Sequence, residues 1–214
     1  MSWKPEIDEI ARKRALGEED SAEGIARQHA KGRLTIRERA DALLDPGSFQ
    51  EIGPGAGGAE RDADGKLVSF TPANFLLGFG TIDGRRCIVG GEDFAIKGGS
   101  PNAAGLRKSI YAEDLALRYR VPLIRLHEGG GGSVGGAGGK TVGSPVYEAP
   151  RFRSVAQAMA SVPVATAALG PVAGLPAARL VAAHFSVMSR DTAQVLIAGP
   201  AVVRRAIGEN KTKE

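Results

Sequence analysis

The chain has 214 residues, of which 24% are charged, 43% hydrophobic and 5% aromatic, and its net charge is +4. The length suits one globular domain with a buried core, and so few aromatics with so mild a charge argue against a nucleic-acid partner. No apolar run approaches 18 residues and the N-terminus is charged, so we expect neither a membrane segment nor a secretory signal. The single cysteine, Cys87, excludes an internal disulfide framework and fits a cytoplasmic protein.

Residues 1–44 are predicted to be helical, since apolar residues recur at near-helical spacing in 34–44 and Asp45-Pro46-Gly47 ends the pattern. The stretch 1–30 is highly charged, so it is either a solvated helix or an arm that packs on a partner subunit. We therefore predict an N-terminal helical arm over residues 1–50 and a second unit over residues 51–214. Within the second unit, the glycine-rich and charged stretch 52–66 predicts a loop.

Strands and helices are predicted to alternate from residue 74 onward. The Asp83-Gly84 dipeptide between two apolar runs is typical of a β-hairpin. We expect helices over 106–119, 155–160 and 173–183, and a last short one from Gly199-Pro200. We expect strands over 74–82, 86–90, 121–126, 162–169, 184–188 and 193–198. The order β-β-α-β-loop-α-β-α-β-β-α indicates an α/β fold, with Ile110, Leu115 and Leu117 as core candidates on the first of these helices.

Glycine makes up 30 of the 214 residues, about twice the usual share, and eight of the eleven residues 129–139 are glycine. A strand that ends in glycines exposes backbone N–H groups that can approach an anion or a developing oxyanion closely. The strand predicted at 121–126 does so at Gly129–Gly132. The turn Gly170–Gly174, which leads into the next helix, could supply a second donor, and the alternative is a surface loop plus a tight turn.

A nucleotide-binding loop is the rival interpretation of these glycines. Gly139-Lys140-Thr141 matches the end of the P-loop pattern, but Val134 stands where its first glycine belongs. The loop is also several residues too long, and the sequence after Thr141 does not begin a helix. We therefore prefer an ordinary glycine-rich loop.

Few side chains in this sequence carry chemistry. His127-Glu128 lies at a strand end, where it is either catalytic or structural, and we expect His184 to be a core histidine and Cys87 to be buried. No paired-ligand spacing is present, so we expect no metal in this chain. An enzyme built on this sequence would work through backbone dipoles.

Several blocks, in order, resemble the carboxyltransferase β subunits of biotin-dependent acyl-CoA carboxylases. The first is KGRLTIRERADALLDPGSFQEIG (31–53), and the next is FGTIDGRRCIVGGEDFAIKGGS (79–100), followed by LRKSIYAEDLAL. PLIRLHEGGGG (122–132) stands where the family has a strand and a D-S-G-G-A type turn. LGPVAG (169–174) stands at a G-x-x-A-G-G helix start, and RDTAQVLIAGPAVVRRAIGE (190–209) resembles the closing block. The resemblance covers about residues 25–214.

The resemblance implies a crotonase-like fold of repeated β-β-α units, in which a first domain binds acyl-CoA and a second binds carboxybiotin. It implies a ligase component that moves a carboxyl group from biotin to the α-carbon of an acyl-CoA. Backbone N–H pairs would stabilise the thioester enolate and the biotin ureido oxyanion. The implied partners are a biotin carboxyl carrier or biotin carboxylase subunit, a C-terminal carboxyltransferase half and further copies of the chain in an oligomer. No A-M-K-M biotin-attachment motif is present, so biotin would be carried by a partner.

Position by position, Gly130, Gly131 and Gly132 match the first glycine turn of the family. Gly174 and Leu175 match its A-G-G helix start. By this resemblance, the N–H groups of these residues are the candidate catalytic donors for the acyl-CoA oxyanion.

Arg107 and Lys108 match a basic pair on a family helix near the CoA, and Ala173 belongs to the A-G-G motif. We assign these three residues to binding of the acyl-CoA. For the basic pair, contact with a CoA phosphate and a solvated helix face both remain open.

Two departures from the family pattern define a second hypothesis. Leu175-Pro176 replaces the second glycine of A-G-G and removes one N–H donor, and the first turn is H-E-G-G-G-G-S. The chain could therefore be a non-catalytic crotonase-like binding or assembly subunit. It also stops where the family continues into a second domain, so we expect a fragment or half-subunit that is inactive alone. The sequence does not specify which acyl-CoA is used or whether the reaction runs as carboxylation or decarboxylation.

Overall fold

The computed structural model describes residues 3–18, 22–131 and 151–212. Its helices are α1 (Lys4–Glu18), α2 (Ala22–His29), α3 (Ile36–Leu43), the 3₁₀ turn η1 (Lys97–Gly99), α4 (Ala103–Tyr119), α5 (Arg151–Met159), α6 (Leu175–Val181) and α7 (Pro200–Ile207). Its strands are β1 (Gln50–Glu51), β2 (Gly57–Arg61), β3 (Leu67–Pro72), β4 (Phe75–Ile82), β5 (Arg85–Glu92), β6 (Leu123–Gly129), β7 (Val164–Ala173), β8 (Phe185–Met188) and β9 (Gln194–Leu196). Across the described residues, no helix is long and apolar enough to cross a lipid bilayer.

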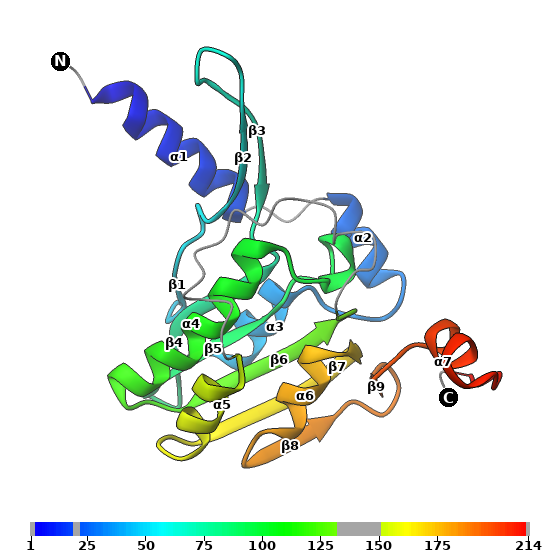
Figure 1. Ribbon diagram of the computed structural model, residues 1–214. Coiled ribbons are helices and arrows are strands. Elements are labelled where there is room, and N and C mark those ends of the chain that lie inside the picture. Colours follow the sequence, from blue (N-terminus) through cyan, green and yellow to red (C-terminus); the bar gives the residue numbers. More distant parts are fainter. Residues whose placement is uncertain (1–2, 19–21, 132–150, 213–214) are drawn as a thin grey trace.

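One mixed sheet forms the body of the molecule. Its strands lie in the order β1-β4-β5-β6-β7-β8, and β9 pairs with β7 beyond the end of β8. The pairs β1–β4 and β4–β5 are antiparallel, whereas β5, β6, β7 and β8 run parallel. Helices α4, α5 and α6 cover one face of the sheet and α3 covers the other (Figure 1). The described elements thus confirm the predicted α/β class and the predicted order of strands and helices from residue 74 onward.

The predicted hairpin is present as β4 and β5. Both turn residues have positive φ, +49° at Asp83 and +72° at Gly84, which matches the twist of a two-residue hairpin. The Asp45 carboxylate accepts the N–H groups of Asp83 (3.0 Å) and Gly84 (2.9 Å). The residue that ends the α3 segment therefore also fixes this turn.

The main core lies between the sheet and α4. Leu77, Ile88 and Leu123 from three adjacent strands have exposed fractions of 1% or less. The predicted core residues Ile110 and Leu115 are buried, whereas Leu117 is only partly buried. A second cluster, between α3 and the opposite face of the sheet, contains Ile36, Ala40, Leu44, Leu76, Cys87, Val89 and Leu126. Cys87 is therefore buried as predicted, and burial raises the pKa of its thiol.

The prediction that residues 1–44 are helical was wrong in one respect, because the helix is interrupted. Three helices replace it, and Thr35 begins α3 in a capping box, in which its hydroxyl accepts the N–H of Glu38 and the Glu38 carboxylate accepts the N–H of Thr35. This cap requires extended backbone at Thr35, which breaks any helix running through it.

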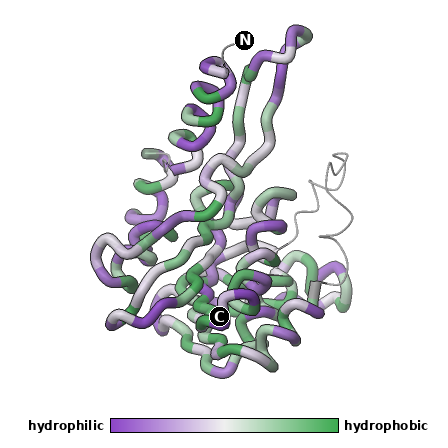
Figure 2. Tube along the Cα trace, turned by 90° about the vertical axis from the view of Figure 1, so that its left-hand side faces the viewer, coloured by the Kyte–Doolittle hydropathy of each residue, from purple (hydrophilic) through white to green (hydrophobic). Residues whose placement is uncertain are grey.

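The predicted loop over 52–66 was wrong in its middle part, because residues 57–61 form β2, which pairs with β3 in a hairpin. Every residue of β2 is exposed. Strand β2 therefore has no buried face, and its sequence lacks the alternating apolar pattern that identifies a strand. Figure 2 shows α1 and this hairpin projecting together from one end of the molecule.

The predicted turn at Gly170-Pro171 was wrong as well. Strand β7 continues through it to Ala173 with strictly alternating burial, and α6 begins at Leu175. Pro171 is tolerated because it lies where β7 leaves β8 and pairs with the short strand β9. His184 is exposed rather than in the core, and its Nδ1 accepts the N–H of Val164 at 3.1 Å.

Truncating a core side chain tests this packing. We expect Leu77→Ala to lower the free energy of unfolding by about 3 kcal/mol, because the Leu77 side chain is fully buried among three strands and α4. The matched control is Leu34→Ala, since Leu34 is 47% exposed and should change stability by less than about 1 kcal/mol. Urea unfolding followed by circular dichroism measures both, and equal losses in the two variants would contradict the assignment of the core.

Candidate active site

The carboxyl ends of the parallel strands β6 and β7 meet at one edge of the sheet. Gly129 at the end of β6 pairs with Val172 near the end of β7. A Cβ atom placed on Gly131 would lie 2.8 Å from the carbonyl oxygen of Ala173 and 3.3 Å from Cα of Gly174. The glycine turn after β6 therefore contacts the start of α6, and the two predicted donor segments lie together.

Glycine is required at both contact points. Gly131 has a φ of +73°, and Gly174, which precedes α6, has φ +64° and ψ −127°. Side chains rarely adopt such backbone conformations, and the space at Gly131 also has no room for a methyl group. The local sequence thus permits an approach of two backbones that other residues would prevent.

The backbone N–H groups at this contact are not equivalent. Gly130 donates to the carbonyl of Gly98 (2.9 Å), and Gly174 donates to the carbonyl of Leu196 (3.2 Å). Within the described residues, the N–H groups of Gly131 and Leu175 have no acceptor. The structure therefore leaves these two as available donors among the five that the sequence had suggested. Gly132, and the Val134 and Lys140-Thr141 positions of the P-loop interpretation, lie outside the described residues.

The basic pair on α4 differs from both sequence interpretations. Lys108 is buried; its Nζ donates to the carbonyl of Gly53 (3.3 Å) and lies 3.5 Å from the Glu51 carboxylate. Burial lowers the pKa of Lys108, which Glu51 partly opposes. Lys108 therefore joins α4 to the loop after β1 and is not on a solvated helix face. Arg107 is half-buried and has its own interaction partner, and Ala173 places its carbonyl beside Gly131.

A buried polar network that the sequence analysis missed lies beneath the glycine turn. His127 is fully buried, and its Nδ1 lies 3.1 Å from the Glu92 carboxylate at the end of β5. Its Nε2 has no partner among the described residues. Methylene carbons of Glu92 also fill the space beside Gly99 and Gly129. The Glu92–His127 pair thus connects the ends of β5 and β6.

The start of α6 is held by a second part of this network. Glu113 on α4 accepts from Arg125 of β6 and from Arg179 of α6 (3.1 Å), and Arg179 also donates to the Ser109 hydroxyl (2.9 Å). Burial, followed by the neighbouring charge of Arg125, lowers the pKa of Arg179 to about 10, so Arg179 stays charged at neutral pH. The ion pairs therefore fix α6, and with it Leu175, against α4 and β6.

On the opposite face of β6, Glu128 joins the N-terminal segment to the sheet. Its buried carboxylate pairs with Arg33 (2.7 Å) and Arg39 and accepts from the Gln28 amide (3.0 Å). A Cβ atom on Gly170 would lie 2.4 Å from this carboxylate, so glycine is needed there to give it room. Residues of α2, α3 and the segment between them are thus anchored directly under the candidate site.

The space beside Leu175 is small. A cavity of about 10 Å³, lined in part by Glu92, Ser109, Leu175, Pro176 and Arg179, holds about one water molecule. Among the described residues, no three His, Cys, Asp or Glu side chains form a group able to hold a metal ion. The chemistry that this geometry offers is therefore that of two available backbone donors on segments in direct contact.

Comparisons with known proteins find similar sequences. The family model described as carboxyl transferase domain matches residues 27–214. The propionyl-CoA carboxylase beta chain of Saccharopolyspora erythraea is 32% identical over 196 residues, which are 91% of this chain and 35% of that protein. The carboxyltransferase subunit of propionyl-CoA carboxylase from Haloferax mediterranei is 30% identical over 220 residues, 99% of this chain and 40% of that protein. The chain thus spans well under half the length of these curated relatives.

A solved structure gives the fold. The transcarboxylase 12S structure with methylmalonyl-coenzyme A bound superposes with a TM-score of 0.74, at 24% identity, over 100% of this chain and 41% of that one. The fold is therefore the crotonase-like fold that the sequence blocks implied.

The Glu92 carboxyl makes the stability of this network depend on pH. Burial by itself would raise the pKa of Glu92, but the positive charges of His127 and Arg125 outweigh burial and hold it below its usual 4.5. The unfolded chain then takes up this proton at higher pH than the folded chain does. The stabilisation is therefore complete above about pH 4.5 and is lost as pH falls toward the folded-state pKa.

We expect Glu92→Gln to flatten the acid limb of the stability curve between about pH 5 and pH 3, by at most about 1.4 kcal/mol per pH unit, the value for one proton. Urea unfolding at a series of pH values measures the slope. Glu60→Gln is the control, because Glu60 is exposed on β2 and should leave the slope unchanged. A Glu92→Gln slope that parallels the wild type would show that Glu92 does not titrate as described.

Proposed function

The chain belongs to the carboxyl transferase domain family, and we propose that it is the acyl-CoA-binding half of a biotin-dependent carboxyltransferase. The reaction would move a carboxyl group from carboxybiotin to the α-carbon of an acyl-CoA. The observation that carries this proposal is the pair of available N–H groups on Gly131 and Leu175, on two segments in direct contact.

The two donors suit the thioester of an acyl-CoA. Removing the α-proton places negative charge on the thioester oxygen, and two N–H groups directed at that oxygen stabilise it more in the enolate than in the ground state. Donors that are already fixed by folding need no reorganisation during the reaction. The Glu92–His127 and Glu113–Arg179 pairs hold Gly131 and Leu175 in place from below. In this proposal the backbone binds and polarises the thioester, and no side chain acts as the base.

Biotin, carried by a partner protein, would supply both the carboxyl group and the base for the α-proton. We place its site on the C-terminal carboxyltransferase half, since the resemblance assigns acyl-CoA to the first domain alone. The working enzyme would be an oligomer in which both halves and a biotin carrier meet, and this chain by itself would be inactive.

Exposed apolar side chains on β8, β9 and α7 support the need for a C-terminal half. Phe185 and Met188 on β8 are 65% and 56% exposed, and Ile197 beside β9 is 82% exposed. Val202 and Ile207 on α7 are also exposed, and α7 lies apart from the sheet (Figure 1). Apolar surface of this extent is typical of a face that a partner covers.

A non-catalytic binding or assembly subunit is the second candidate. Two observations favour it: the small cavity beside Leu175 and the buried Pro176, which has no N–H to donate. A thioester would enter this site only if the Leu175 side chain moved.

A methyl group added at Gly131, where the glycine turn contacts Ala173, tests the leading proposal. We expect wild-type chain to bind acetyl-, propionyl- or a longer acyl-CoA saturably in calorimetric titration, and not to bind Mg-ATP. Gly131→Ala should weaken that binding at least about tenfold and, with the C-terminal half added, slow carboxylation about a hundredfold. The reason is that the new methyl group would lie against the Ala173 carbonyl and displace the N–H.

Gly84→Ala is the matched control for this variant. Gly84 has nearly the same φ, +72°, but a Cβ atom there meets nothing within 4 Å. Its backbone strain is equal, while its binding and rate should remain those of the wild type. Failure of the folded wild-type chain to bind any CoA thioester, even with the C-terminal half present, would refute the proposed function.

Removing the Leu175 side chain separates the two candidate functions. Leu175→Gly restores the second glycine of the A-G-G motif and keeps the N–H, so a catalytic site should gain carboxylation rate in the complex with the C-terminal half. A pure scaffold would show no activity before or after the change. Val181→Gly at the other end of α6 controls for the loss of helix stability, since Val181 is 73% exposed.

A further inference from the structure

Helix α1 packs on its own chain through one side only. Every residue of α1 is exposed except Glu9, Lys13 and Gly17, which are half-buried and recur every four residues. Glu9 pairs with Lys13 and with Arg61 of the β2–β3 hairpin. A Cβ atom on Gly17 would collide with the backbone of Pro54. These half-buried residues therefore mark the side of α1 that contacts the rest of the molecule.

A row of apolar side chains on another side of α1 is left uncovered. Trp3, Ile7 and Ile10 are between 61% and 74% exposed, and their spacing of four and three residues places them along one line of the helix. Trp3 belongs to this line because its carbonyl accepts the N–H of Ile7 (3.1 Å). With about 3.6 residues per turn, the row lies about a quarter turn from the side that packs on the hairpin. Three large apolar side chains exposed in one row are typical of a helix face that another helix covers.

Arg14 extends this row, and the spacing of the row is the same in both directions. Positions 3, 7, 10 and 14 are separated by four, three and four residues. Two copies of α1 laid antiparallel are therefore in register, with Ile7 of each copy opposite Ile10 of the other. Trp3 then lies opposite Arg14, whose guanidinium can stack on an indole ring while its edge keeps the Glu18 carboxylate. Such a pair has a two-fold axis, because the same surface of each copy contacts the other.

The charges of α1 favour the same orientation. Residues 4–9 carry one lysine and three carboxylates, a net charge of −2, and residues 12–18 carry three basic residues and one carboxylate, a net charge of +2. An antiparallel second copy places each half against the opposite charge, whereas a parallel copy would place like charges together. This charge order also suits the macrodipole of a single helix, but the macrodipole does not account for the apolar row. Charge and spacing together therefore favour a second α1 as the occupant.

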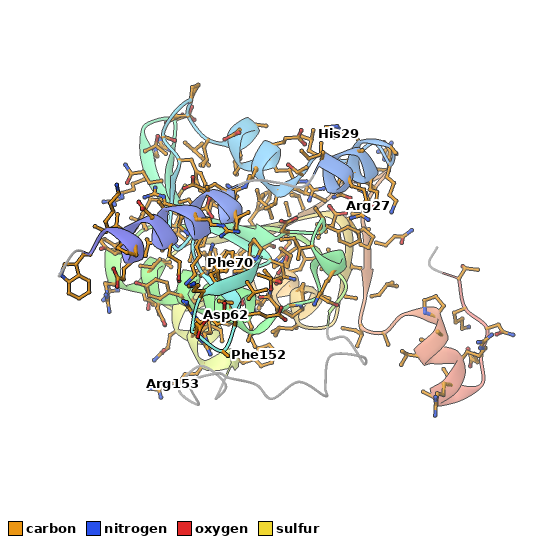
Figure 3. The ribbon with its side chains drawn as sticks, turned by 90° about the horizontal axis from the view of Figure 1, so that it is seen from above. Arg27, His29, Asp62, Phe70, Phe152 and Arg153 are labelled. Carbon is orange, nitrogen blue, oxygen red and sulfur yellow. The ribbon has the colours of Figure 1, made fainter. Side chains whose placement is uncertain are left out.

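The position of α1 suits contact with a second copy. Helix α1 and the β2–β3 hairpin project together from one end of the molecule (Figure 2), and contacts between α1 and β3 hold α1 in place. Seen from above, α1 and α7 lie at opposite ends of the molecule (Figure 3). A second copy on α1 and a C-terminal half on β8, β9 and α7 would therefore use different surfaces.

We propose that α1 is a self-association surface, on which α1 of a second copy of this chain packs antiparallel along the row from Trp3 to Arg14. The inference does not depend on the proposed function, because it concerns a surface away from the glycine turns. A row of four side chains per copy is small beside the about 1,200–2,000 Å² of a standard stable interface. The pair is therefore a reversible dimer, which adds to the contacts of a larger oligomer.

The test measures self-association of the 214-residue chain by sedimentation equilibrium over a range of concentrations. The variant is Ile7→Ser/Ile10→Ser, which removes the centre of the apolar row. The matched control is Ile197→Ser/Ile207→Ser, which removes two other exposed isoleucines, one beside β9 and one on α7. Circular dichroism shows whether both variants are folded, and all four isoleucines are exposed, so we expect both to fold.

We expect a monomer–dimer equilibrium in the wild type and in the control. The dissociation constant of the α1 variant should be at least about tenfold higher, because each copy loses two isoleucines from the contact. A wild type that stays monomeric at every concentration, or a variant that associates as tightly as the wild type, would refute the proposal. Association lost in the control but not in the variant would assign the dimer to β9 and α7 and also refute it. If a monomeric wild type binds vesicles of anionic phospholipid through Ile7 and Ile10, the row binds lipid and the proposal fails.

Cysteine cross-linking tests the direction of the pair. An Ile7→Cys chain mixed with an Ile10→Cys chain should form a disulfide-linked heterodimer faster than either variant links to itself, since antiparallel packing places position 7 opposite position 10. The native Cys87 is buried and should not compete. Faster linkage within each single-variant sample than in the mixture would indicate parallel packing and would refute the antiparallel arrangement.

Discussion

The close contact between the backbones at Gly131 and Gly174 is the constraint on which the site depends. Two peptide segments can donate to one oxygen only if they approach without side chains between them, and here a methyl group on Gly131 would collide with Ala173. The parallel pairing of β6 and β7 delivers both segments to the same edge of the sheet. At both positions φ is positive, and within the described residues the N–H groups of Gly131 and Leu175 have no acceptor.

Buried charge holds this contact from two sides. On the α4 face, Glu113 lies between two guanidinium groups, and Glu92 faces His127. On the α3 face, Glu128 joins Arg33 and Arg39. Buried ion pairs contribute little net stability, because desolvation offsets most of their attraction. Their geometry is directional, however, and each pair joins elements that carry or support the donor segments. The network therefore positions the backbone more than it stabilises the fold.

The sequence predictions were correct where the pattern depended on residues close together in the chain, and they failed where it depended on distant ones. The Asp83-Gly84 turn and the α4 helix depend on neighbouring residues, and both were predicted correctly. The β2–β3 hairpin was missed because none of its strand residues is fully buried. The Gly170-Pro171 turn was predicted from residue types that usually break strands, whereas Gly170 is there to make room for Glu128. At Gly131 the glycine indicates a turn with close backbone contact, whereas at Gly170 it makes room for a side chain within a strand.

The polar network could not be found in the sequence. Glu92 and His127 come from different strands, and Glu113 and Arg179 come from different helices. Nothing in their local patterns shows that these residues meet. Lys108 is the reverse case, because its position on α4 resembled a surface site until the fold placed Glu51 and Gly53 beside it.

The parallel arrangement of β5 to β8 also has a consequence for how the chain folds. Within the main sheet of the described residues, β4 and β5 alone form a local hairpin, and β6, β7 and β8 each pair only after a long crossover connection. Strand β8 leaves its outer edge open among the described residues, with the sequence Phe-Ser-Val-Met and no lysine or proline to discourage pairing. An open strand edge of this kind is a template for pairing between chains, so a partner that covers β8 would also protect the protein from aggregation.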